Sequence, residues 1–100
     1  MKTEIIHKIV LNSSNELLLL LSSPGKPMYQ YVYREAAGVY WDDKQKGFKS
    51  TPLKHWTVSE WFIHIKDIVR TSLNVDLQVD ENLQWENIPD TEQIKLKDLI

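Results

Sequence analysis

Residues 57–73 carry the pattern that most constrains the fold, a helix-start signal followed by one continuous apolar face. Thr57 and Glu60 have the spacing of a capping box, in which the threonine hydroxyl accepts from the Glu60 backbone N–H and the glutamate carboxylate accepts from the Thr57 N–H. Trp56 and Trp61 flank this start at the spacing of a hydrophobic staple. The sequence therefore predicts a helix that begins at a defined residue.

The apolar residues of this helix recur with the 3.6-residue period and gather on one face. Such a face needs a sheet to cover it, because each large side chain fully buried there contributes about 1.5–3 kcal/mol. Ile63 falls off this face and is expected to be exposed, and Asn74 is suited to end the helix in a left-handed conformation. The apolar face consists of Val58, Trp61, Phe62, Ile65, Ile68, Val69 and Leu73.

Two short segments near the start of the chain are expected to form a hairpin. Residues 5–11 are rich in isoleucine, residues 12–15 are a cluster of turn formers, and residues 17–21 are five consecutive leucines. A short apolar run bounded by turn signals is typical of a strand buried on both faces. The strand at residues 17–21 is thus the natural cover for the helix.

Residues 28–35 are predicted to form a strand. Their alternation places Tyr29, Tyr31 and Tyr33 on one side. That side either packs under the helix or under Trp85, or stays exposed as a stacking platform, and the sequence leaves the choice open.

The remaining elements follow from alternation and turn chemistry. Residues 39–41 and 48–50 are expected to pair as a hairpin, and residues 75–80 alternate as a half-buried strand. Residues 83–85 are expected to turn back and pair, whereas residues 90–100 fit a helix or a strand. Together these elements predict one α+β domain, residues 1–100, with an antiparallel sheet of four to six strands and one main helix on one face.

Composition limits the cellular location and the classes of partner that we expect for this protein. The chain has no cysteine, so disulfides and thiolate metal sites are excluded, and no apolar stretch approaches the length of a membrane span. We therefore expect a cytoplasmic protein with no membrane association. The net charge is −2, which makes nucleic acid an improbable partner even though lysines lie near the aromatic residues.

No catalytic or metal motif stands out. His64 and Asp67 are three positions apart on the polar helix face, but two ligands do not make a metal site. An enzyme would have to use His55 or His64 with Asp42 or Asp67. We expect no cofactor and no metal, and favour binding over catalysis.

The aromatic residues suggest one kind of binding site. Tyr31, Tyr33, Trp41 and Trp61 are candidates to line a pocket between helix and sheet, with Arg34 beside them. Tyr, Trp and Arg are enriched where partners bind. A small amphipathic ligand in this pocket is the alternative function.

The acidic residues suggest a second kind of binding site, and binding of a partner there is our leading hypothesis for the function. A stretch without lysine or arginine could attract a basic protein partner, with Asp80 and Glu81 at its centre and Trp85 as an anchor. Exposed strand edges in so small a protein also make a homodimer plausible. The stretch contains Asp76, Asp80, Glu81, Glu86, Asp90 and Glu92.

Residues 31–42 and 46–50, followed by Trp56, Trp61 and Phe62, resemble small orphan proteins carried by bacterial integron gene cassettes. The resemblance covers about the middle third of the chain and implies a compact α+β domain encoded by an accessory gene of a mobile element. The same segment resembles, more faintly, immunity proteins of bacterial toxin systems. Neither resemblance brings a functional residue with it.

Overall fold

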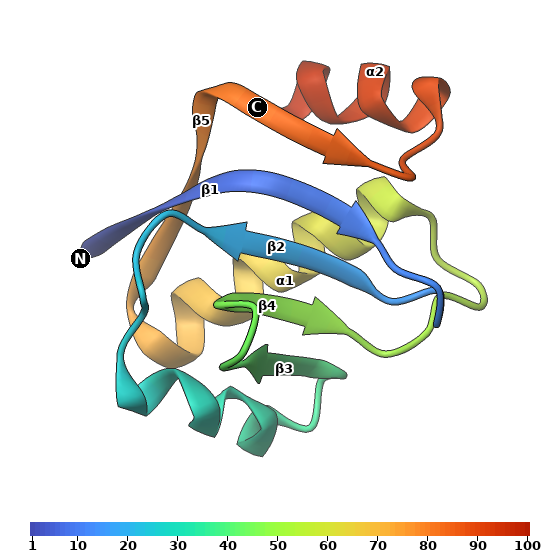
Figure 1. Cartoon of the computed structure of the whole chain (residues 1–100). Helices are drawn as coiled ribbons and strands as arrows, with labels where there is room; N and C mark the ends of the chain where they lie inside the picture. The colour runs from blue at the N-terminus through green and yellow to red at the C-terminus, as the bar shows by residue number, and fades with distance from the viewer.

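The computed structural model describes residues 1–100 as a five-stranded sheet with a long helix, α1, across one face (Figure 1). The strand order is β3-β4-β2-β1-β5, so β3 and β5 form the two edges. The α+β class and the number of strands are as predicted. The elements are β1 (Lys2–Leu11), β2 (Leu17–Leu21), the 3-10 helix η1 (Pro27–Glu35), β3 (Val39–Asp42), β4 (Gly47–Ser50), α1 (Val58–Leu73), β5 (Val75–Glu86) and α2 (Asp90–Leu99).

Helix α1 begins and ends where its local signals predict. The Thr57 hydroxyl accepts from the Glu60 N–H at 3.2 Å, and the Glu60 carboxylate accepts from the Thr57 N–H at 3.0 Å, completing the capping box. Asn74 adopts φ 58° and ends the helix. Ile63 is 50% exposed, as expected for a residue off the apolar face.

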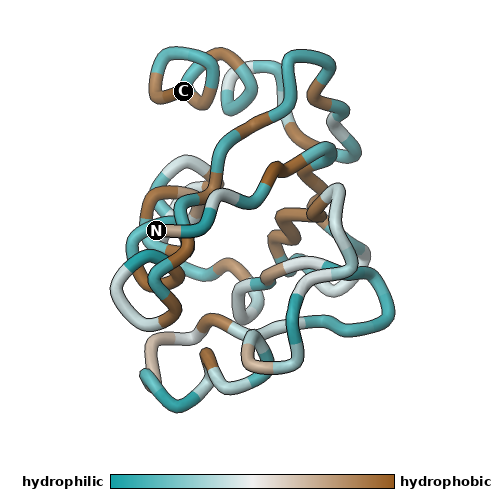
Figure 2. Tube along the Cα trace, turned by 90° about the vertical axis from the view of Figure 1, so that its left-hand side faces the viewer, coloured by the Kyte–Doolittle hydropathy of each residue, from teal (hydrophilic) through white to brown (hydrophobic).

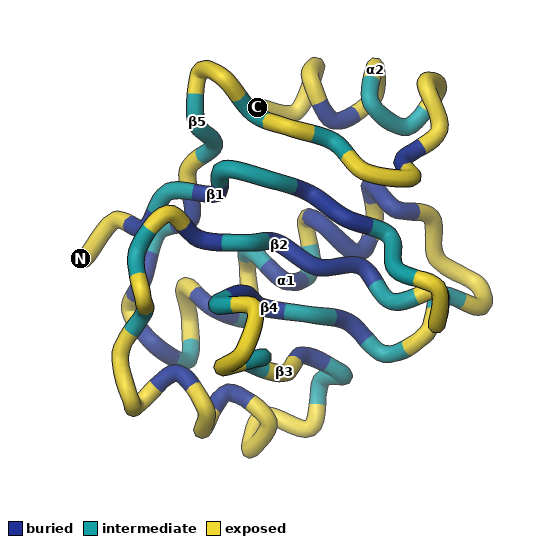
Figure 3. The backbone as a smooth tube through the Cα atoms, in the orientation of Figure 1, coloured by how far each residue is buried: buried dark blue, intermediate teal, exposed yellow.

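Strand β2 is the centre of the core, because it lies between β1 and β4 and four of its five leucines are buried. Figure 3 shows a buried band through β1, β2, β4 and the inner side of α1. In Figure 2 hydrophobic stretches lie mostly toward the middle of the molecule and hydrophilic residues follow the outer loops. One apolar row crosses all five strands in register: Trp41, Phe48, Leu19, Ile9 and Trp85.

The opposite sheet face is covered by no helix (Figure 1), yet Leu18 and Val10 on it are buried. Long polar side chains lie on the same face, and the apolar stems of such side chains can cover apolar neighbours. Two ion pairs join such side chains: Lys8 of β1 with Glu86 of β5 at 2.9 Å, and Lys49 of β4 with Glu16, which precedes β2, at 4.0 Å.

The predicted strand at residues 28–35 is wrong, because this segment forms η1. A 3-10 helix has three residues per turn, which places Tyr29 and Val32 on its inner side, where both are buried. Tyr31 and Tyr33 then point outward and are exposed. The three tyrosines do not share a face, and the alternation in the sequence was misleading.

The prediction that residues 83–85 pair back is also wrong, and with it the wholly antiparallel sheet. Strand β5 bends near residues 80–83, and both of its halves pair in parallel with β1: Lys2 with Val75 in the first half and Ile9 with Trp85 in the second. The sheet is therefore mixed. The ambiguous final segment forms the helix α2, which buries Leu96.

A buried polar cluster joins η1 to the edge of the core. The Glu4 carboxylate is buried and accepts from the Tyr29 hydroxyl at 2.6 Å and from the Ser23 hydroxyl at 2.7 Å. Burial, the hydrogen bond to Glu4 and the negative charge of that carboxylate together raise the pKa of Tyr29 far above its ordinary value. This long-range contact ties η1 to β1.

We expect Tyr29→Phe to lower the free energy of unfolding by about 1.5–3 kcal/mol at pH 7, because the substitution removes a hydrogen bond to a buried carboxylate. The raised pKa means that this stabilisation is complete below about pH 10, the ordinary pKa of tyrosine, and is lost as the pH rises further. Urea denaturation of both proteins should show a smaller difference in the free energy of unfolding at pH 11 than at pH 7. Equal differences at the two pH values would contradict a stabilising hydrogen bond from the Tyr29 hydroxyl to Glu4.

Candidate functional site

The loop between β4 and α1 is fixed at two points and displays three side chains between them. At the first point, the Leu53 N–H donates to the Asn15 carbonyl and the Asn15 side-chain amide donates to the Leu53 carbonyl, both at 2.9 Å. At the second, Thr57 is held by the capping box. The exposed side chains in between are those of Lys54, His55 and Trp56.

Trp56 lies against an aromatic cluster at the start of α1. Its ring meets Trp61 edge to face with centroids 5.1 Å apart, and meets His64 in the same way at 4.9 Å. The His64 ring Nε2 donates to the Ala37 carbonyl at 2.8 Å, which fixes the ring. Trp61 is 9% exposed, whereas Trp56 is 43% exposed, so the cluster has a buried floor and an accessible top.

A depression of about 570 Å³ opens beside this cluster. Backbone geometry keeps its floor tight: a Cβ on Gly38 would lie 3.0 Å from Trp61 Cη2, and the φ of +76° there favours glycine. Trp56 also borders a second depression of about 410 Å³ on its other side. The larger depression is lined by Ala37, Thr51, Pro52, Lys54, His55, Trp56 and Trp61.

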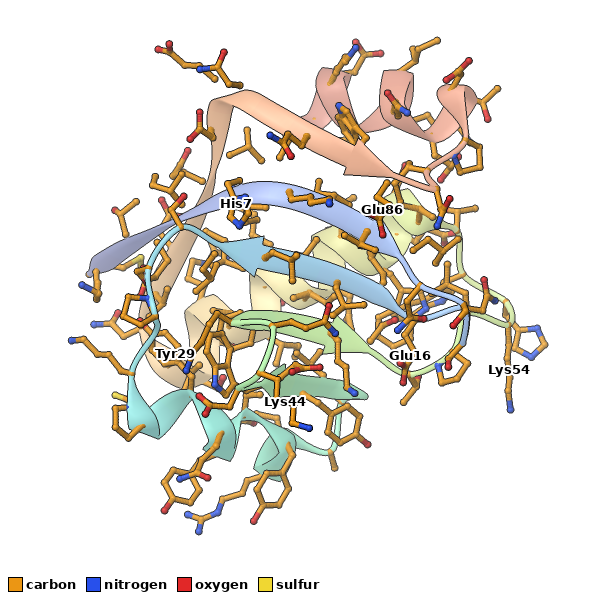
Figure 4. The ribbon with its side chains drawn as sticks, in the orientation of Figure 1. His7, Glu16, Tyr29, Lys44, Lys54 and Glu86 are labelled. Atoms are coloured by element: carbon orange, nitrogen blue, oxygen red, sulfur yellow. The ribbon has the colours of Figure 1, made fainter.

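The charge around the larger depression is basic. Lys54 and His55 line it, no acidic side chain does, and the Lys54 ammonium makes no ion pair. Figure 4 shows Lys54 extending away from the body of the protein on this loop. The side chain is therefore free to turn toward a bound group.

Two of the N–H groups at the start of α1 already donate to carboxylates of the chain. Glu60 accepts from Thr57, and Glu92 of α2 accepts from the Ser59 N–H at 3.1 Å. Burial alone would raise the pKa of Glu92, but the Ser59 hydrogen bonds and the charge of Lys95 hold that pKa below its ordinary value. Two carboxylates of the chain therefore lie at the helix terminus, and the basic side chains of the depression come from its loop.

The four aromatic residues predicted to line one pocket are not brought together. Tyr31 and Tyr33 are exposed on η1, where the Arg34 guanidinium lies 4.3 Å from the centroid of the Tyr31 ring. Trp41 packs under η1, with its ring centroid 5.3 Å from that of Tyr29. Trp61 belongs to the separate cluster at the start of α1.

The acidic candidates do meet. Asp80, Glu81 and Trp85 border one depression of about 360 Å³ between β5 and α2. Lys97 of α2 lines the same depression, a basic contribution that the sequence pattern did not indicate. This group lies at the β5 edge of the sheet, whereas η1 packs beside β3 at the other edge.

The candidate acid–base pairs are not joined by hydrogen bonds. His64 is bonded to a backbone carbonyl, and Asp67 accepts from Arg70 at 3.2 Å. Asp42 accepts from the turn amides that follow it, and two of these bonds are 3.0 Å long. No group of three His, Asp or Glu side chains is placed to hold a metal ion.

Sequence reasoning did not group Lys54, His55 and Trp56 as one site, because Trp56 was assigned only a staple role and His55 was considered only as an acid–base residue. The available signal was the short stretch between Pro52 and the cap at Thr57, which contains basic and aromatic residues in place of the usual turn formers. What the sequence did not show was the Leu53–Asn15 contact that holds this stretch in position.

Comparison with known proteins decides the family. Residues 6–82 match the family described as Integron Cassette Protein Hfx_Cass5. The chain belongs to the Hfx_Cass5 integron cassette protein family. This confirms the resemblance seen in the sequence to integron cassette proteins.

One solved structure is also similar to this Hfx_Cass5 family member: "Structure from the mobile metagenome of North West Arm Sewage Outfall: Integron Cassette Protein Hfx_Cass5". The two sequences are 23% identical, the match covers 98% of this chain and 95% of that chain, and the TM-score is 0.45. No curated protein matches the chain. None of its helices combines the length and the apolar character that crossing a membrane requires.

We expect Thr57→Ala to lower the free energy of unfolding by about 1 kcal/mol, because the capping hydroxyl is lost. The substitution should also loosen Trp56, which precedes the cap, and so broaden its indole N–H signal in NMR spectra. Thr57→Ser keeps the hydroxyl and serves as the matched control. The role of the cap would be contradicted if both variants behaved like the original protein.

Proposed function

We propose that this Hfx_Cass5 family member is a binding protein that takes a small planar ligand in the depression beside Trp56. The observation that supports this most directly is the 43% exposure of a tryptophan whose backbone is fixed next to a cavity of about 570 Å³. The proposal keeps the expected aromatic-lined pocket but moves it to the loop between β4 and α1.

The shape and chemistry of the depression suit such a ligand. Pockets for small molecules commonly enclose about 300–1,000 Å³ and combine apolar walls with a few polar groups. Trp56 and Trp61 supply the aromatic surface, and Pro52 and Ala37 complete the apolar walls. A flat ligand can stack on Trp56 with little loss of protein entropy, since the ring already rests on Trp61 and His64.

We expect neutral planar aromatics such as indole, quinoline and 2-naphthamide to include compounds that bind here and shift the indole N–H signals of Trp56 and Trp61. A compound at ten times its dissociation constant should add about 1.4 kcal/mol of stability, and the melting temperature should rise by several degrees. Trp56→Ala should abolish both effects. Ile94→Ala, which removes an exposed apolar side chain from α2 and lines neither depression beside Trp56, should leave them unchanged.

The ligand-binding proposal fails if none of these compounds perturbs Trp56 or Trp61. It also fails if Trp56→Ala and Ile94→Ala reduce the effects equally, since binding would then be non-specific contact with the surface.

A second candidate function rests on β5, whose outer edge pairs with no other strand. The strand has four acidic residues and no basic one, so a second copy of β5 would meet like charge, whereas a basic extended segment would meet opposite charge. Such a segment could add to the sheet edge through backbone hydrogen bonds and place side chains near Trp85. This proposal keeps the basic protein partner of the leading hypothesis from the sequence and adds a sheet edge as the place of contact.

For this second function we expect a ten-residue peptide of alternating lysine and valine to bind and shift the amide signals of β5. Asp80→Lys with Glu81→Lys should weaken binding about tenfold, and added salt should weaken it further because exposed charges are screened. Glu35→Lys with Asp67→Lys changes the net charge equally but lies away from β5, and should have little effect. Equal losses in both double variants would contradict a specific site on β5, and light scattering would reveal a homodimer instead.

A further inference from the structure

We infer that the depression beside Trp56 selects planar aromatic ligands that carry a negative charge, such as an aromatic carboxylate. This inference rests on the proposed ligand-binding function and adds the charge of the ligand to it. It depends on the polar groups around the depression, which are donors on its loop side and are not occupied by partners within the chain.

Three donors are available to a bound anion. The Lys54 ammonium makes no ion pair, and neither the His55 ring nor the Thr51 hydroxyl takes part in a side-chain hydrogen bond. All three side chains line the depression. Hydrogen bonds from an ammonium to a carboxylate are stronger than neutral ones, so a charged ligand gains more from this set than a neutral ligand of the same shape.

The acidic residues nearby do not cancel this preference. Glu60, which borders the neighbouring depression beside Trp56, has its carboxylate in the capping box. Glu92 accepts from Ser59 and pairs with Lys95 at 3.2 Å. Asp67, which borders the same neighbouring depression, pairs with Arg70 at 3.2 Å. These carboxylates therefore bind groups of the chain other than Lys54, which makes no ion pair.

The positions of the charge and the aromatic surface also fit one ligand. Lys54 and Trp56 are two residues apart on a loop held at Leu53 and Thr57, so neither can move far from the other. A ring stacked on Trp56 can therefore present its carboxylate to the flexible Lys54 side chain. The charged group stays at the rim, where desolvation costs least.

The test compares 2-naphthoate with 2-naphthamide, a neutral compound of nearly the same shape, by calorimetry and by the Trp56 and Trp61 indole signals. We expect 2-naphthoate to bind about tenfold more tightly. Lys54→Ala should remove most of this difference while leaving 2-naphthamide unaffected. Lys44→Ala removes another exposed lysine without an ion pair, located in the β3–β4 turn (Figure 4), and should change neither affinity.

Each outcome has a distinct meaning. Equal affinity of the two compounds, or a preference for 2-naphthoate that survives Lys54→Ala, overturns the selection of anions by this loop but leaves the proposed ligand site intact. If neither compound binds at Trp56 and Trp61, the charge selection and the site both fail.

Discussion

The rest of the structure depends on the burial of one face of α1 against the sheet. Phe62, Ile65 and Val69 belong to the same core as Leu19 and Ile9 on the central strands. Because this contact fixes the position of α1, it also fixes Trp61, which stands at the border between core and surface. The accessible aromatic site is therefore an extension of the core, and its floor is as rigid as the packing beneath it.

Elements governed by neighbouring residues could be predicted from the sequence, and elements governed by distant contacts could not. The start of α1 at Thr57 and its end at Asn74 follow from side chains within a few positions. The position of η1 involves instead a hydrogen bond from Tyr29 to Glu4, which the sequence separates widely from it. Strand β5 likewise takes its direction from β1, and alternation along β5 holds no information about that partner.

The same distinction applies to the candidate sites. Asp80, Glu81 and Trp85 are close in sequence and remain close in the structure. Tyr31 and Trp41 were grouped on the assumption of a strand at residues 28–35, so their separation follows directly from that error. Trp56 could not be recognised as a site from the sequence, because the Leu53–Asn15 contact that holds its loop joins two segments far apart in the chain. Membership in the Hfx_Cass5 family supplies no functional residue, so the geometry is what supports the proposals.

The parallel pairing of β1 with β5 has a consequence for how the chain reaches its native state. Lys2 pairs with Val75 and Val10 with Glu86, so β1 cannot complete its hydrogen bonding until the chain through Glu86 has left the ribosome. Contacts between such distant segments slow folding, because a large loop must close before they form. Until then the edge of β1 opposite β2 has no partner strand. Transient shielding of that edge by a chaperone would favour folding over aggregation.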